Sequence, residues 1–155
     1  MRNLLMAILA AACCTWACNQ KAPVPKMTGL AGSMQDSIFV RLWPNEIDSL
    51  LRKNPNIPFV DVRSEVEFRT SHIYRSMNCP FFADNFDQRI LRLDPNAPVI
   101  LYDTESSVSI MAADKMRQLG FKKIYELCGG LFTWARDGKT IVSGDSGIDS
   151  SIILK

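Results

Sequence analysis

The chain of 155 residues carries 18 basic and 16 acidic side chains, a formal net charge of +2, and 47% of its residues are hydrophobic. This length predicts a single domain with a modest core. The basic residues are scattered along the chain. We therefore expect no nucleic-acid partner, because binding to nucleic acid requires clustered positive charge.

The N-terminal segment, residues 1–17, has the pattern of a secretory signal. A short basic start precedes an apolar run from Leu4 to Ala12, and small residues follow that run. The run is too short to cross a bilayer as a helix of the mature protein, which is typical of a cleaved signal. The alternative is a buried helix of the domain, although the segment that follows is polar and linker-like.

Small residues before cysteines make this signal similar to that of a bacterial lipoprotein, in which the cysteine is lipidated and becomes the mature N-terminus. We expect lipidation at Cys18, with Cys13 as the alternative. Residues 18–37 are polar and contain proline and glycine, which predicts a flexible spacer. The resemblance implies export and a lipid anchor in the bacterial cell envelope, on a membrane face that the sequence leaves open.

Strand-like and helix-like segments alternate from residue 38 to residue 143. Short apolar runs predict strands at 38–42, 58–62, 74–80, 98–102 and 122–127. Helical patterns lie after them at 44–54, 64–72, 84–93, 107–120 and 129–138. This alternation predicts an α/β domain with a mainly parallel five-stranded sheet and helices on both faces. Residues 144–155 are expected to form a C-terminal tail.

Three segments, in this order, resemble a rhodanese-like domain, the sulfurtransferase family. The first is FVDVRSEVEF and the second is SHIYRSMNCP. The third is LGFKKIYELCGGLFTWARDGKTIV, which includes a double glycine and a tryptophan helix. The resemblance runs from about Ile38 to Val142 and implies a single domain of this fold over residues 38–143.

The segment PVILYDTESSVS, residues 98–109, resembles the strand and loop that carry the nucleophilic cysteine of this family. The position that matches the cysteine holds Asp103, and the matching loop contains Thr104, Glu105, Ser106, Ser107 and Val108. Val108 stands near the place where the family has an arginine. A carboxylate has no sulfur to extend into a persulfide, and its charge repels thiosulfate. We therefore expect no catalytic residue in this loop and no standard sulfur-transfer reaction.

Two roles remain open for Asp103. In the structural role, its carboxylate accepts hydrogen bonds from the loop amides or caps the helix that starts near Ser107. In the functional role, it forms a cation or polar-ligand site together with Glu105. Backbone amides that point inward would oppose a cation, so we favour the structural role.

Cys128, at the end of the fifth predicted strand, is the thiol that an active enzyme would use in place of the missing nucleophile. Nothing next to it in sequence supplies an activating cation, which favours an ordinary thiol. The family strand order would place two strands between Cys128 and Cys79, a separation of roughly 14 Å that exceeds the reach of a disulfide. We expect two free thiols.

A second group of residues is expected to be structural and to lie near the crevice. It contains Asp61, Arg63, Glu67 and the single histidine, His72. We expect the first three to form an ion-pair and capping cluster rather than an acid–base pair, and Ser64 and Glu67, three residues apart, predict a capping box at the start of a helix. The resemblance implies a hydrogen-bonded structural role for His72. The cysteines and the histidine lack the spacing of metal ligands, so we expect neither a metal nor another cofactor.

The function that the sequence favours is a catalytically inactive binding or regulatory module of the cell envelope. Its partner would be an envelope protein or a small ligand, in addition to the membrane reached through the lipid. The alternatives are an active thiosulfate or persulfide sulfurtransferase, another thiol enzyme that uses Cys128, and a mainly structural envelope component.

Overall fold

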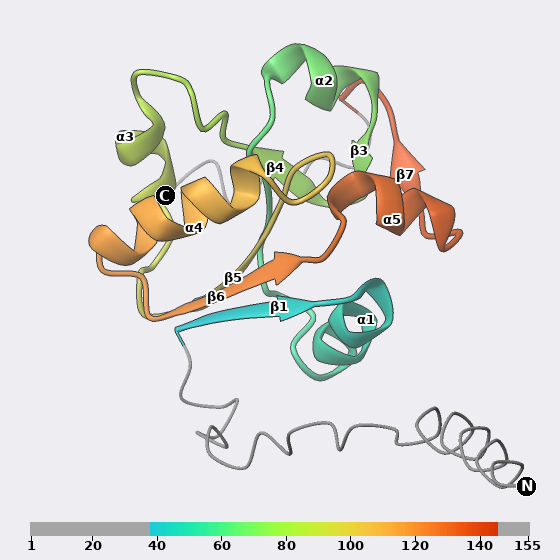
Figure 1. Ribbon diagram of the computed structural model, residues 1–155, viewed down its shortest axis with the longest axis horizontal. Helices are drawn as coiled ribbons and strands as arrows, with labels where there is room; N and C mark the ends of the chain where they lie inside the picture. Colours follow the sequence, from blue (N-terminus) through green and yellow to red (C-terminus); the bar gives the residue numbers. More distant parts are fainter. Residues whose placement is uncertain (1–37, 146–155) are drawn as a thin grey trace, which may run out of the picture. The chain divides into compact units, whose positions relative to one another are not determined.

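The computed structural model describes residues 38–145 (Figure 1). The predicted signal peptide at 1–17, the spacer at 18–37 and the tail beyond residue 145 lie outside the described residues, as do Cys18 and Cys13. Within residues 38–145, no helix is both long enough and apolar enough to cross a membrane.

The domain is built on a five-stranded sheet in the order β1-β6-β5-β2-β4. The strands are β1 (Phe39–Leu42), β2 (Phe59–Asp61), β4 (Ser76–Asn78), β5 (Pro98–Tyr102) and β6 (Lys123–Leu127). Every neighbouring pair is parallel. The parallel five-stranded sheet confirms the predicted α/β class, and its order places β5 at the centre.

Helices cover both faces of the sheet, as the sequence predicts (Figure 1). They are α1 (Pro44–Lys53), α2 (Glu65–Thr70), α3 (Phe86–Ile90), α4 (Val108–Gln118) and α5 (Gly130–Arg136). Residues of α3 and α4 pack on one face, where Met116 belongs to the same buried cluster as Leu101. On the other face, Ile47 of α1 and Trp134 of α5 cluster with Ile100. Burial on both faces explains the continuous apolar run of β5.

A second, two-stranded sheet is a feature that the sequence patterns do not predict. It pairs β3 (His72–Ile73) with β7 (Ile141–Val142) in antiparallel orientation. The helix predicted over 64–72 consequently ends at Thr70, because the chain becomes extended at Ser71. The strand predicted over 74–80 is shortened to β4, since Arg75 adopts a φ of 64° in the turn before it.

The helix predicted over 84–93 is shorter in the structure. Only α3 is α-helical, and the amides of Arg92 and Leu93 bond to carbonyls three residues earlier. Such bonds tighten the chain out of the α-helical path. Pro95 follows Asp94 and disfavours a helical conformation at that residue, so the helix does not extend further.

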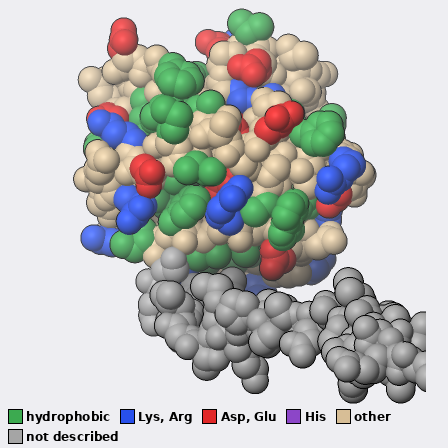
Figure 2. Space-filling model, viewed as in Figure 1, with side chains coloured by type: hydrophobic (Ala, Val, Ile, Leu, Met, Phe, Trp, Pro, Cys, Tyr) green, Lys and Arg blue, Asp and Glu red, His purple; other side chains and the backbone are tan. Residues whose placement is uncertain are grey.

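Charged side chains of both signs are interspersed on the face shown in Figure 2. Hydrophobic side chains lie among them, so neither sign of charge forms an extended patch on that face.

Tyr102, the last residue of β5, connects the large sheet to the small one. Its hydroxyl accepts a hydrogen bond from the amide of Ile73 at 3.1 Å and lies 2.9 Å from the Ser76 hydroxyl. Tyr102 is fully buried, and its ring packs edge-on against Phe59 at 5.8 Å. The end of the central strand therefore positions the turn between β3 and β4.

Replacing Tyr102 with Phe removes this hydroxyl and leaves the buried Ile73 amide without its acceptor. We expect the free energy of unfolding to fall by about 1–2 kcal/mol. Urea denaturation followed by circular dichroism measures the change. Tyr74→Phe, at a tyrosine that is 52% exposed, is the matched control and should have little effect. Equal stability of the Tyr102 and Tyr74 variants would contradict the assigned role.

Candidate functional site

The loop between β5 and α4 is organised around the carboxylate of Asp103. The side chain of this residue accepts hydrogen bonds from the backbone amides of Ser106, Ser107, Val108 and Ser109. The bond from Ser107 is 2.8 Å long and that from Ser109 is 3.3 Å. Asp103 itself is only 2% exposed. The amides of Ser107, Val108 and Ser109, at the start of α4 where a helix leaves N–H groups without internal partners, therefore point to one carboxylate.

These bonds determine the ionisation of Asp103. Burial on its own raises the pKa of this carboxyl, but the hydrogen bonds from the backbone amides outweigh burial and hold the pKa below its usual value. The positive end of the α4 helix dipole acts in the same direction. Asp103 is therefore an anion at neutral pH, and its hydrogen bonds are charge-assisted.

The loop is held in place from two sides. Ser106 adopts a left-handed conformation with φ of 77°, and its hydroxyl bonds to the Leu127 carbonyl and the Gly129 amide. From the other side, the amide of Leu131 in α5 donates to the backbone oxygen of Asp103 at 2.8 Å. A Cβ at Gly130 would overlap that same oxygen, so the second glycine of the pair permits this close approach.

A buried polar chain continues beneath the loop. The hydroxyl of Ser109 donates to Glu126 at 3.0 Å, and Glu126 pairs with Arg41 of β1 at 2.9 Å. Sequence reasoning missed these three residues. Strand alternation could have indicated that Glu126 is buried. Side chains of a strand alternate between its two faces, and Glu126 shares the buried face of β6 with Ile124.

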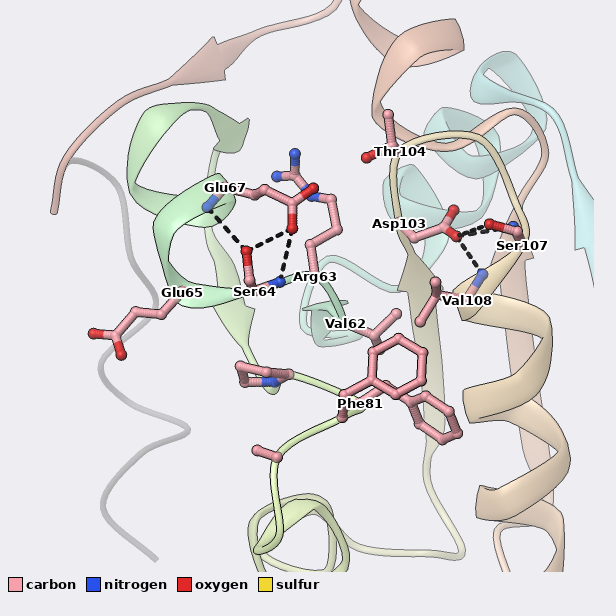
Figure 3. A pocket seen from close by; sticks show the side chains of 13 residues that line it. Val62, Arg63, Ser64, Glu65, Glu67, Phe81, Asp103, Thr104, Ser107 and Val108 are labelled. Atoms are coloured by element: carbon pink, nitrogen blue, oxygen red, sulfur yellow. Dashed lines mark hydrogen bonds between the residues drawn. The ribbon is translucent and has the colours of Figure 1, made fainter.

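A cavity of about 400 Å³ lies beyond the carboxyl ends of β2, β4 and β5 (Figure 3). We call it the crevice. It is lined by residues of the β5–α4 loop, the start of α2 and the segment after β4: Val62, Arg63, Ser64, Glu65, Glu67, Pro80, Phe81, Phe82, Ala83, Asp103, Thr104, Ser107 and Val108. Of the predicted loop residues, Glu105 and Ser106 are not among the residues that line it. The sequence patterns also missed the aromatic wall formed by Phe81 and Phe82.

The predicted structural cluster is divided between the crevice and the core. Arg63 pairs with the fully buried Asp61 at 2.6 Å and also donates to the Ser71 carbonyl. Burial on its own lowers the pKa of Arg63, but the hydrogen bond to Asp61 and its charge hold the pKa above its ordinary value. Arg63 and Glu67 line the crevice, whereas Asp61 is not among the lining residues.

The other two members of that cluster have separate roles. Glu67 accepts hydrogen bonds from the backbone and the hydroxyl of Ser64, which completes the predicted capping box of α2. His72 is fully buried, its Nδ1 lies 2.9 Å from the Phe68 carbonyl, and its ring stacks on Phe68. These contacts are structural.

The cysteines of the described domain lie apart from the crevice lining. Cys128 is 8% exposed, and burial together with the charge of Glu126 raises its pKa. Burial raises the pKa of Cys79 to about 11. Both are free thiols, and the strands β5 and β2 separate β6 from β4. Among residues 38–145, no group of three or more His, Cys, Asp or Glu is arranged to hold a metal ion.

The family of this domain follows from the fold and from a match to known sequences. The rhodanese-like domain model matches residues 44–137, so the chain belongs to the rhodanese-like family. Among solved structures, the Alr3790 protein from Anabaena superposes with a TM-score of 0.61 at 23% identity, over 66% of this chain and 80% of that one. Thiosulfate sulfurtransferase from Pseudomonas aeruginosa superposes with a TM-score of 0.57 at 23% identity. The match covers 68% of this chain and 20% of that one. These likenesses show the fold.

Curated relatives are longer proteins that contain a similar segment. The tRNA uridine(34) hydroxylase of Sodalis glossinidius is 28% identical over 92 residues, which cover 56% of this chain and 26% of that protein. The enzyme of the same name from Hamiltonella defensa is 26% identical over 104 residues, which cover 63% of this chain and 28% of that protein. The chain thus spans about a quarter of the length of the curated relatives it matches.

Replacing Asp103 with Asn removes the charge and places an NH₂ group among N–H donors. We expect the free energy of unfolding at pH 7 to fall by about 2–3 kcal/mol, because several charge-assisted bonds are lost. Glu105→Gln is the matched control, since Glu105 is an exposed acid two residues away. Urea denaturation of both variants measures the difference.

The same comparison has a defined pH dependence. The pKa of Asp103 is lowered in the folded state, so its stabilisation is present above the unfolded pKa of about 4 and is lost as pH falls through the folded value. The stability difference between wild type and Asp103→Asn should therefore shrink below about pH 4. A difference that stays constant down to about pH 2 would contradict this assignment.

Proposed function

We propose that this rhodanese-like domain is inactive as a sulfurtransferase and acts as a binding module. In this proposal, Asp103 occupies the position that the family resemblance gives to the nucleophilic cysteine. The observation that supports it is the set of backbone amides between Ser106 and Ser109, which all donate to the Asp103 carboxylate.

The chemistry of sulfur transfer explains why this contact matters. A persulfide forms when a thiolate takes a sulfane sulfur from a donor, and the resulting anion needs amide or cationic stabilisation. Asp103 offers no sulfur atom, and its oxygens already use the amides that could stabilise such an anion. Its charge would also oppose the binding of an anionic sulfur donor.

The alternative thiol chemistry through Cys128 has less support. A reactive thiol needs a lowered pKa and access to a substrate. Burial and the charge of Glu126 raise the pKa of Cys128, and this residue is not among those that line the crevice. A cation site formed by Asp103 and Glu105 is also disfavoured, because N–H donors surround the Asp103 oxygens and Glu105 does not line the crevice.

The proposed setting is the bacterial cell envelope, where a lipid on Cys18 would anchor the chain. The signal pattern of residues 1–17 supports this proposal. The partner would then be an envelope protein or a small ligand that enters the crevice. Labelling with a radioactive fatty acid tests the anchor: Cys18→Ser should abolish the label, and Cys13→Ser should retain it. Loss of label only with Cys13→Ser would move the anchor to Cys13.

The catalytic part of the proposal is tested by transfer of sulfur from thiosulfate to cyanide. We expect no activity above background for the wild-type protein. Asp103→Cys should recover little, because Glu105 and Val108 supply no cation and Arg63 is already paired with Asp61. Cys128→Ser is the control variant. Wild-type activity that disappears in Cys128→Ser would overturn the proposal.

A further inference from the structure

We propose that the crevice binds a small organic cation, an ammonium group carried on an aromatic or branched aliphatic body. This inference rests on the proposed binding function and extends it by naming the chemical class of the ligand. It follows from the shape, the apolar walls and the distribution of charge in the crevice.

The size and walls of the crevice suit a small apolar body. Its volume of about 400 Å³ falls in the range of small-molecule sites. The segment after β4 contributes Pro80, Phe81 and Phe82 to the wall, and Val62 and Val108 complete it (Figure 3). Phe82 packs edge-on against Phe81 with the ring centroids 5.1 Å apart, yet it remains 75% exposed. A ligand body against Phe82 would bury an aromatic surface that now faces water.

The loop that follows β5 disfavours an anionic ligand. Its converging amides are already used by Asp103. An anion at this end of the crevice would therefore meet a carboxylate, with the hydroxyls of Thr104 and Ser107 as neighbouring polar groups. Neutral hydroxyls can accept a hydrogen bond from an ammonium group as readily as they donate to other ligands.

The opposite wall provides the charge that a cation needs. Glu67 points towards the crevice in Figure 3, whereas Glu65 points away and pairs with Arg69 at 3.1 Å. Both bonds from Ser64 to the Glu67 carboxylate use Oε2, and within residues 38–145 no hydrogen bond reaches Oε1, although the charge of Glu67 acts on the nearby Arg63. Arg63 also lines the crevice, but the buried Asp61 matches its charge.

The charge balance of the crevice is therefore negative. Asp103 has its oxygens among N–H donors, so it repels an anion but leaves Glu67 as the carboxylate that can meet a ligand. The charge of Glu67 also acts on Arg63, whose own charge is matched by the buried Asp61. These features favour a cation over a neutral or anionic molecule of the same shape.

The test compares three probes that share one phenyl body: phenethylamine, 2-phenylethanol and 3-phenylpropanoate. Calorimetric titration of the full chain at low ionic strength measures their affinities. We expect the amine to bind about fivefold more tightly than the alcohol and the carboxylate to bind most weakly, as one exposed ion pair would give. Added salt should weaken the binding of the amine more than that of the alcohol.

Two variants and a control identify the site. Glu67→Gln keeps the hydrogen-bonding capacity of the capping box and removes the charge, so it should weaken amine binding about fivefold and leave alcohol binding unchanged. Phe82→Ala should weaken the binding of the amine and of the alcohol alike. Glu105→Gln, an exposed acid outside the crevice lining, should change neither.

The outcomes separate this inference from the proposed function. Absence of amine binding, equal or tighter binding of the alcohol or the carboxylate, or amine binding that Glu67→Gln leaves unchanged would overturn the inference. In each of these cases, absence of sulfur transfer would leave the proposed inactive module standing. Sulfur transfer by the wild-type protein would overturn the proposed function whichever probe binds.

Discussion

The hydrogen bonds between the Asp103 carboxylate and the amides that follow it are the interaction on which the site depends. They satisfy the unpaired N–H groups at the start of α4 and place a negative charge at the positive end of that helix. The same bonds use the donors that an anionic ligand would need. One side chain therefore stabilises the local structure and occupies the N–H donors at this end of the crevice.

Local patterns in the sequence were sufficient for much of this arrangement. The alternation of strands and helices, the capping box of Ser64 and Glu67, and the contact of Asp103 with the loop amides all depend on residues close together in the chain. The features that could not be predicted join distant residues. The β3–β7 sheet consists of two-residue strands, and the Arg41–Glu126 pair links positions 85 residues apart. Short apolar segments such as Phe81–Phe82 also carry no periodicity that fixes which way their rings point.

The crevice combines an aromatic wall with an uneven distribution of charge. Its aromatic wall, with Phe82 open to solvent, suits an apolar body, and Glu67 at the start of α2 adds negative charge to the lining. Arg63, the cation of the site, is paired with the buried Asp61. The proposed loss of catalysis and the proposed preference for a cation thus have a common origin in the distribution of carboxylates.

The attachment of the loop to α5 has a consequence for how its sequence can vary. The amides of Leu131 and Phe132 bond to the backbone oxygens of Asp103 and Thr104, atoms that every residue type possesses. Provided that Gly130, Asp103 and Ser106 are retained, the loop can keep its course while its outward side chains diverge. Substitutions at these outward positions would change the surface that the loop presents and leave the fold of the domain intact. New side chains could be engineered there for the same reason.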